Sequence, residues 1–134
     1  MSESADDAVQ RFRRIYIGDS LIQQLSLNFQ EMRCTLLLSS AILLKDEVSP
    51  SIFDPKARYM PAVLTFDGLQ SVTCPEGTFY LNATVVEFDA VADATSDLIN
   101  FRLVMTGGFD NDSFMRSLLF KAKDFSLGPI NPDG

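Results

Sequence analysis

The sequence predicts a single all-β domain of mainly antiparallel strands, arranged as a β-sandwich or a curled, open barrel of about six to eight strands. Three observations lead to this prediction. Apolar residues recur with a period of two in several segments, as they do in strands with one buried face. Glycines, prolines and short acidic clusters separate those segments. No segment sustains a helical spacing, and 134 residues suit one domain.

The N-terminus, residues 1–10, is predicted to be a polar lead-in, followed by one antiparallel β domain at 11–128 and a C-terminal tail at 129–134. The best helical candidate is the segment from Ala5 to Phe12, which suits a short helix and an irregular coil equally well. The fold class therefore allows one short helix at this end of the chain.

Two alternating segments follow, and the short link Gln30-Glu31 between them predicts a hairpin. One face of the first segment carries Leu21, Leu25, Leu27 and Phe29. One face of the second carries Met32, Cys34, Leu36 and Leu38. We expect each strand to turn one such face toward the core.

Later segments complete the strand pattern. The apolar residues of one face are Ile99, Phe101, Leu103 and Met105 in one segment, and Phe114, Leu118, Phe120 and Ala122 in another. Between residues 79 and 91 the parity of the alternation changes, which a β-bulge and a strand that switches sheets would both explain. Connections are predicted at residues 45–61, 74–77, 93–97 and 107–112.

The chain is acidic, with a formal net charge of -7, and this charge is unevenly distributed. Between Glu76 and Asp112, seven acidic residues are opposed by one basic residue, Arg102. An acidic face repels nucleic acids and anionic membranes and attracts a basic protein, and the alternative is that it only keeps the protein in solution. The candidate protein-binding residues are Glu87, Asp89, Asp93, Asp97, Asp110 and Asp112.

The N-terminus lacks the pattern of a signal peptide, and no stretch is apolar and long enough to span a membrane. We therefore expect a cytoplasmic protein. In that compartment Cys34 and Cys74 are expected to stay reduced and to behave as small hydrophobic residues.

The side chain that most often carries acid–base catalysis is missing, because the chain has no histidine. We expect no enzymatic activity, no catalytic residue, no cofactor and no metal site. Asp110, Asp112 and Ser113 resemble a fragment of a calcium loop, but such residues are also typical of turns. Glu87 and Asp89 share one strand face, either as a carboxylate pair of the glycosidase kind or as solvated side chains.

A basic cluster near the N-terminus consists of Arg11, Arg13 and Arg14. It is suited to an anion or an acidic partner, or to ion pairs with the protein's own carboxylates. Three charges are too few for a nucleic-acid surface in so acidic a chain.

Several motifs occur in a familiar order, namely residues 16–22 (YIGDSLI), 62–72 (AVLTFDGLQSV), 101–108 (FRLVMTGG) and 119–125 (LFKAKDF). This order resembles small bacterial β-rich families of uncharacterised function, the YxiG-like and immunity-protein-50-like domains. Members of those families often carry a histidine where this chain has Gly18. The resemblance implies an immunity-type domain that neutralises a toxin by binding it.

The sequence thus predicts a non-enzymatic, protein-binding domain whose acidic face docks on a basic partner such as a toxin. The candidate aromatic anchors are Phe53, Tyr59, Phe79, Tyr80 and Phe109, and the alternative for these side chains is a place in the core. Two other functions stay open. One is a small ligand held inside a curled barrel, and the other is a structural homo-oligomer built by pairing of edge strands.

Overall fold

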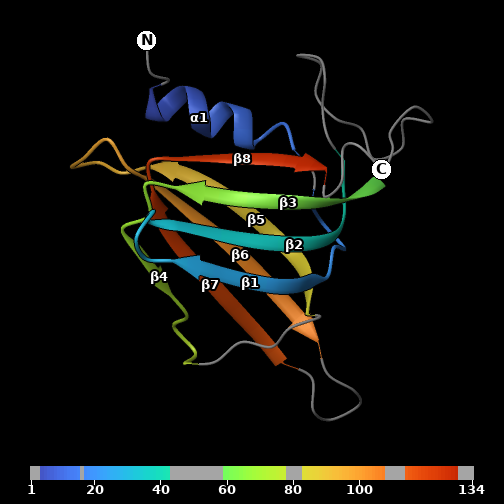
Figure 1. Ribbon diagram of the computed structural model, residues 1–134. Helices are drawn as coiled ribbons and strands as arrows, with labels where there is room; N and C mark the ends of the chain where they lie inside the picture. The colour runs from blue at the N-terminus through green and yellow to red at the C-terminus, as the bar shows by residue number, and fades with distance from the viewer. Residues whose placement is uncertain (1–3, 16, 43–58, 78–82, 108–113, 130–134) are drawn as a thin grey trace.

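The computed structural model describes residues 4–15, 17–42, 59–77, 83–107 and 114–129 (Figure 1). This part of the chain contains, in order, α1 (Ala5–Phe12), β1 (Ile22–Asn28), β2 (Arg33–Ile42), β3 (Tyr59–Asp67), β4 (Ser71–Thr73), β5 (Thr84–Ala92), β6 (Ile99–Gly107), β7 (Phe114–Ala122) and β8 (Asp124–Pro129). The strands form two sheets with the orders β1-β2-β3-β8 and β4-β7-β6-β5, and neighbouring strands are antiparallel. The predicted fold class, mainly antiparallel β-structure with one short N-terminal helix, is confirmed.

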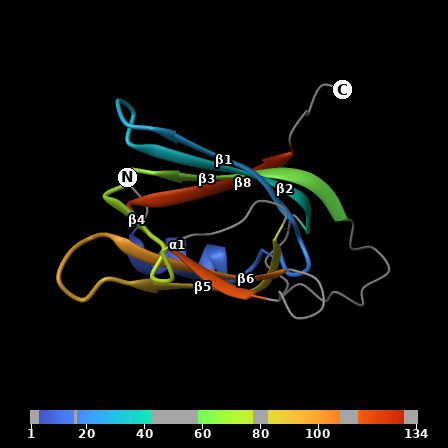
Figure 2. The same ribbon diagram turned by 90° about the horizontal axis from the view of Figure 1, so that it is seen from below.

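The two sheets lie one over the other as the layers of a sandwich (Figure 2), and two bent strands join them at a corner. At Gly68 the chain passes from β3 into β4, and at Lys123 it passes from β7 into β8. The backbone N–H of Gln70 donates to the carbonyl of Lys121 at 2.6 Å, and the N–H of Lys123 donates to the carbonyl of Asp67 at 3.0 Å. The two crossings therefore run side by side and are bonded to each other.

The position of Gly68 at this corner imposes two constraints, one on backbone conformation and one on space, that residues with a side chain would not satisfy. Its φ of +63° lies in the left-handed region. A Cβ atom at this position would lie 2.8 Å from the Cβ of Lys123, which is too close for two carbon atoms. Only glycine adopts such a backbone without steric cost, so the corner depends on it.

A second link joins the sheets at the start of β1. Leu21 and Thr84 form an isolated antiparallel bridge. The backbone N–H of Val85 donates to the carbonyl of Ser20 at 2.8 Å. The hydroxyl of Ser20 is fully buried and accepts a hydrogen bond from the N–H of Ser40 at 3.2 Å, which satisfies this polar group inside the core. The beginning of β1 is thereby held against the beginning of β5.

Aromatic rings fill the space between the sheets. The rings of Phe66 and Phe120 stack with centroids 4.3 Å apart, and Phe101 lies 4.8 Å from Phe66. Phe12 of the helix meets Phe101 at 5.1 Å and Phe125 at 4.9 Å. The inward faces predicted in residues 34–38 and 99–105 are confirmed, since their members are buried: Cys34, Leu36, Leu38, Ile99, Phe101, Leu103 and Met105. Met32 was expected on the first of these faces, but it lies in the turn before β2 and is 45% exposed, so that part of the prediction is wrong.

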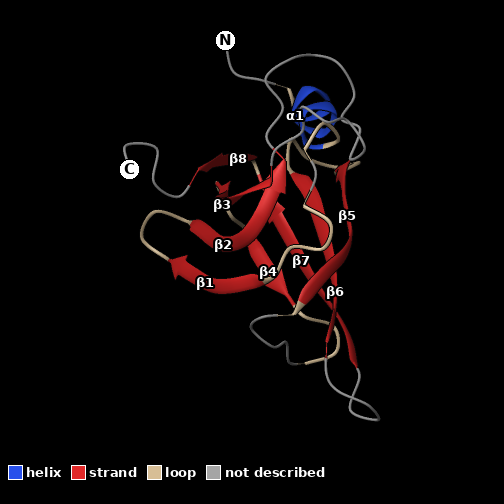
Figure 3. Ribbon diagram, turned by 90° about the vertical axis from the view of Figure 1, so that its right-hand side faces the viewer, coloured by secondary structure: helices blue, strands red, loops and turns tan. Residues whose placement is uncertain are grey.

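Helix α1 lies along β8 and β5, where the two sheets leave an open side (Figures 1 and 3). The hydroxyl of Ser4 caps the helix by accepting a hydrogen bond from the N–H of Asp7 at 3.1 Å. Ala8, Val9 and Phe12 share the buried face of the helix. Ala8 and Val9 belong to the segment expected to be a polar lead-in, so packing against the core starts before residue 11.

The alternation in β1 differs from the prediction. Ile22 is fully buried, whereas the side chain of Leu27 is 42% exposed and that of Phe29 is 85% exposed. A β-bulge between Ile22 and Gln24 adds one residue, so Ile22 and Leu25 come to share a face despite their odd spacing. Leu27 lies on the predicted side of the strand, since it pairs with the buried Cys34, but the expectation that Leu27 and Phe29 are buried is wrong.

Two further bulges explain other local features. The bulge between Val85 and Glu87 accounts for the change of parity predicted between residues 79 and 91, of which 79–82 lie outside the described part. The bulge between Leu38 and Ala41 lies opposite Pro61, so the residue without an N–H occupies a point where the hydrogen-bond ladder is interrupted.

Candidate functional site

The predicted protein-binding carboxylates that lie in the described part of the chain do not form one uniformly acidic face. Glu87 and Asp89 are exposed on β5, and Asp97 is exposed in the turn that follows this strand. Asp93 begins the same turn and is half-buried. Asp110 and Asp112 lie outside the described residues, as does the calcium-loop fragment that they form with Ser113.

Arg102 on β6 lies among the carboxylates of β5. It stands directly opposite Asp89 in the register of the two strands. Its guanidinium Nη1 lies 3.4 Å from the Oε2 of Glu87. Both side chains of this ion pair are more than half exposed, so the pair adds little to stability. Its effect is electrostatic, because it partly neutralises Glu87 and Asp89, and the paired-carboxylate chemistry considered for them loses support.

Asp93 is engaged within its own turn. Its carboxylate accepts hydrogen bonds from the hydroxyl of Ser96 at 2.7 Å, from the side-chain amide of Asn100 at 3.2 Å and from the hydroxyl of Thr95 at 2.9 Å. These hydrogen bonds hold the pKa of Asp93 well below its usual range. The Nζ of Lys121 lies 3.8 Å away. Asp93 is thus a turn-stabilising residue rather than an unengaged carboxylate that a partner could bind.

Glu76, at the start of the acidic stretch, also bonds within the protein. It lies in the turn Cys74–Gly77, which was predicted and is closed by a hydrogen bond from the N–H of Gly77 to the carbonyl of Cys74 at 2.9 Å. The carboxylate of Glu76 accepts a hydrogen bond from the N–H of Ser117, beyond the point where β4 ceases to pair with β7. The side chain of Glu76 therefore takes the place of a strand partner for β7 beyond the end of the short β4.

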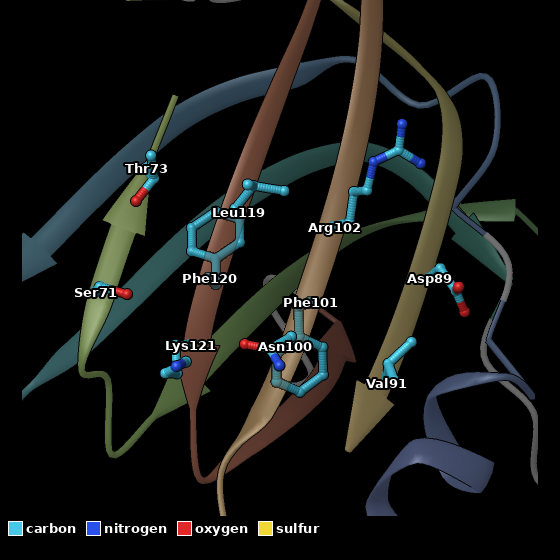
Figure 4. Close-up of a pocket in the computed structure, with 10 residues that line it drawn as sticks. All are labelled: Ser71, Thr73, Asp89, Val91, Asn100, Phe101, Arg102, Leu119, Phe120 and Lys121. Carbon is cyan, nitrogen blue, oxygen red and sulfur yellow. The ribbon is translucent and has the colours of Figure 1, made fainter. Parts of the chain in front are cut away.

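The outer face of the sheet β4-β7-β6-β5 carries a shallow, open hollow of about 370 Å³ (Figure 4). Val91 and Leu119 supply apolar surface there, and Asp89, Arg102 and Lys121 supply charges of both signs. The remaining lining residues are Ser71, Thr73, Asn100, Phe101 and Phe120. Apolar surface with polar and charged side chains around it is typical of a protein contact surface. We call this region the sheet hollow.

A second concave region, of about 300 Å³, lies between the turn of the β1–β2 hairpin and β4. We call it the hairpin groove, and its lining residues are Leu27, Asn28, Phe29, Met32, Arg33, Leu69, Gln70, Ser71 and Val72. Leu27 pairs with the buried Cys34 and so points to the core side of its sheet, but it is 42% exposed. Sequence reasoning missed this groove, although an uncharged stretch ending in Phe29 at a turn was a usable signal.

Hydrogen bonds fix the turn that forms one wall of the hairpin groove. The N–H of Glu31 donates to the side-chain oxygen of Asn28 at 3.0 Å. The N–H of Leu69 donates to the carbonyl of Met32 at 2.8 Å, which ties the corner to the hairpin. Met32 has a φ of +53°, an uncommon conformation for a residue with a side chain. Strained backbone of this kind recurs at functional sites.

Arg11 of the basic cluster contacts the rest of the fold, and the two cysteines lie in the core or pack against it. Arg11 forms an ion pair with Asp124 at 2.5 Å, and its guanidinium carbon lies 4.1 Å from the ring centroid of Phe125. The expected pairing with the protein's own carboxylates is confirmed for Arg11. Cys34 and Cys74 form no disulfide, and burial raises the pKa of the Cys34 thiol to about 11.

Among the described residues, no group of three or more cysteine, aspartate or glutamate side chains is placed to hold a metal ion. The candidate anchors Phe53, Phe79, Tyr80 and Phe109 lie outside these residues, and so does the side chain of Tyr59. No helix in the described part is long and apolar enough to cross a membrane.

No family model, curated protein or solved structure matches this chain. The resemblance to the YxiG-like and immunity-protein-50-like domains therefore stays a prediction.

Proposed function

We propose that this protein is a non-enzymatic binding domain that engages a protein partner through the sheet hollow. The observation that carries the proposal is the composition of this hollow, in which Val91 and Leu119 lie among Asp89, Arg102 and Lys121. A patch of this kind offers apolar area for affinity and charges for orientation. The partner class that we propose is a basic protein, such as a toxin held by an immunity-type domain.

The charge of the whole molecule supports a basic partner. The net charge is -7, and Glu87 and Asp97 extend the negative charge beyond the hollow along β5 and its following turn. A long-range negative potential accelerates the approach of a basic protein, whereas local pairs such as Glu87 with Arg102 set the orientation of docking. Asp89 and Val91 are then the residues at which we expect direct contact.

The packing of the core favours binding at the surface over binding in the interior. Phe66, Phe101, Phe120 and Phe125 occupy the space between the sheets, with neighbouring centroids 4.3 to 5.7 Å apart. An internal ligand would have to displace these rings. The sheet hollow is open to solvent and needs no such displacement.

The test mixes the protein with the products of adjacent genes and measures complex formation by light scattering and titration calorimetry. We expect one stable complex whose affinity falls at least about tenfold with Asp89→Lys or Val91→Arg, and falls with added salt. Asp6→Lys, which reverses an exposed charge on α1, is the matched control and leaves the affinity within about threefold. The absence of any complex, or a complex indifferent to the Asp89 and Val91 variants, would count against the proposal.

A further inference from the structure

The hairpin groove combines a recess with a protruding apolar side chain. Phe29 is 85% exposed at the tip of the hairpin, and Leu27 and Met32 beside it are 42% and 45% exposed. These are three of the six large hydrophobic residues that are exposed in the described part of the chain. Single exposed hydrophobic residues are ordinary, but a contiguous group beside a groove marks an interaction surface.

Charge is almost absent from this surface. No charged residue occurs in the sequence between residues 20 and 30 or between residues 68 and 74, the two segments that supply most of the groove. Arg33 is the charged lining residue, and it is bonded to Asp67 at 2.6 Å and to Glu31 at 2.9 Å. A basic partner therefore finds little attraction here. Two copies of an acidic chain, in contrast, approach with the least repulsion through their uncharged faces.

The opposite open side of the sandwich shows how the fold covers such a surface. There, α1 lies along β8 and β5 and places Ala8, Val9 and Phe12 against the core. On the side between β1 and β4, no helix or strand of the described residues takes the equivalent place, and the hairpin groove is open.

From these observations we infer that the hairpin groove is the contact surface of a homodimer, in which Phe29 of each copy enters the groove of the other. A knob and a recess on one patch are self-complementary about a two-fold axis, and such an isologous contact closes after two copies. The hydrogen bond between Leu69 and Met32 and the one between Glu31 and Asn28 hold the turn in place before association. Little ordering of the turn backbone is then needed on binding, which favours association.

The experiment is sedimentation velocity of the full chain over a wide range of concentration. We expect a monomer–dimer equilibrium whose dissociation constant rises at least about tenfold with Phe29→Ser or Phe29→Lys, because a central aromatic anchor is lost. Since Phe29 is mostly exposed, neither variant should lower the thermal stability of the monomer. Met115→Ser, which removes a side chain that is 60% exposed on the other sheet, is the matched control and should leave the dimer unchanged.

The salt dependence of binding distinguishes this homodimer contact from the contact with a basic partner. The homodimer should tighten or stay unchanged as salt is raised, because screening reduces the repulsion between two acidic copies. The complex with a basic partner should weaken under the same conditions. A monomer at every concentration, a Phe29 variant as dimeric as the wild type, or growth into larger oligomers would each overturn the inference without bearing on the sheet hollow.

Discussion

The ring of Phe12 in the helix meets the ring of Phe125 in the last strand edge-on, with 4.9 Å between centroids and 86° between ring planes. Such edge-to-face contacts add to the stabilisation that comes from burying the rings. Phe12 is fully buried and also contacts Phe101, so one side chain of α1 connects the helix to both sheets.

Replacing Phe12 should therefore release the helix and weaken the whole domain. We expect Phe12→Ala to lower the free energy of unfolding by about 3–5 kcal/mol, the cost typical of removing a buried phenylalanine. Urea denaturation monitored by circular dichroism measures this loss. Gln10→Ala, on the exposed side of the same helix, should stay within about 0.5 kcal/mol of the wild type. Equal effects of the two changes would show that Phe12 does not anchor the helix.

Asp93 should make stability depend on pH in the acid range. Its pKa in the folded protein is lowered by the Ser96, Asn100 and Thr95 hydrogen bonds, from an ordinary value of 3.8. A depressed folded-state pKa stabilises the fold above the unfolded-state pKa, and this contribution is lost as the pH falls below about 4. Asp93→Asn should thus be less stable than the wild type at about pH 7, and the difference should shrink at about pH 3.

Urea unfolding at both pH values provides the measurement for Asp93. The matched control is Asp97→Asn, which removes the same charge from the same turn. A pH dependence for Asp97→Asn equal to that for Asp93→Asn would mean that net charge, and not the hydrogen bonds of Asp93, is responsible.

Cys34 should be chemically inert in the folded protein. Because burial raises the pKa of its thiol to about 11, the reactive thiolate is scarce, and the side chain is inaccessible to reagents. In a Cys74→Ser variant, we expect almost no alkylation by iodoacetamide at about pH 8 in buffer and complete alkylation in urea, read by intact mass. Rapid labelling in buffer would contradict the buried position of Cys34.

The raised pKa of Cys34 also makes the stability of the fold depend on pH in the alkaline range. The folded-state pKa lies above the ordinary value of 9.0, so the unfolded chain releases this proton first. The contribution is therefore complete below about pH 9 and declines as the pH rises above that value.

Replacing Met32 by glycine and replacing Gly68 by alanine should change the free energy of unfolding in opposite directions. Both have a positive φ, of 53° and 63° respectively. Met32→Gly should raise the free energy of unfolding by about 1 kcal/mol, because glycine adopts this conformation freely and Met32 is 45% exposed, so that only part of a side chain's burial is lost. Gly68→Ala should lower it by at least about 1 kcal/mol, because the added Cβ also meets Lys123. Thermal denaturation of the two variants tests the pair, and a destabilising Met32→Gly would show that its side chain matters more than its backbone.

Alternation of apolar residues was sufficient to predict β6 and the central part of β2. Each of these strands keeps one face buried, so the residues predicted to face the core follow each other with an unbroken period of two. A short helix at Ala5–Phe12 could be considered from the sequence for a similar reason. Ala8, Val9 and Phe12 recur at helical spacing, and Ser4 is a favourable cap.

The sites were harder to predict, because they depend on where one sheet ends over the other. Leu27 has the pattern of a core residue, and it points to the core side of its sheet, yet it lies at an edge strand where cover is incomplete. The bulge after Ile22 left no mark that alternation alone could detect. Asp93 illustrates a different difficulty, because a count of acidic residues does not distinguish a carboxylate that stabilises a turn from one that binds a partner. The nearby Thr95 and Ser96, which are typical of such turns, were the available signal.

The ion pair between Arg11 and Asp124 joins residues that are 113 positions apart in the chain. During synthesis, α1 is therefore made well before β8, the strand that completes its docking site. Until β8 emerges from the ribosome, the apolar face of the helix cannot find its full set of contacts, and Phe12 is available to chaperones or to other nascent chains. Completion of β8 closes one sheet and secures α1 in the same event, so native packing of the helix waits for the residues of β8.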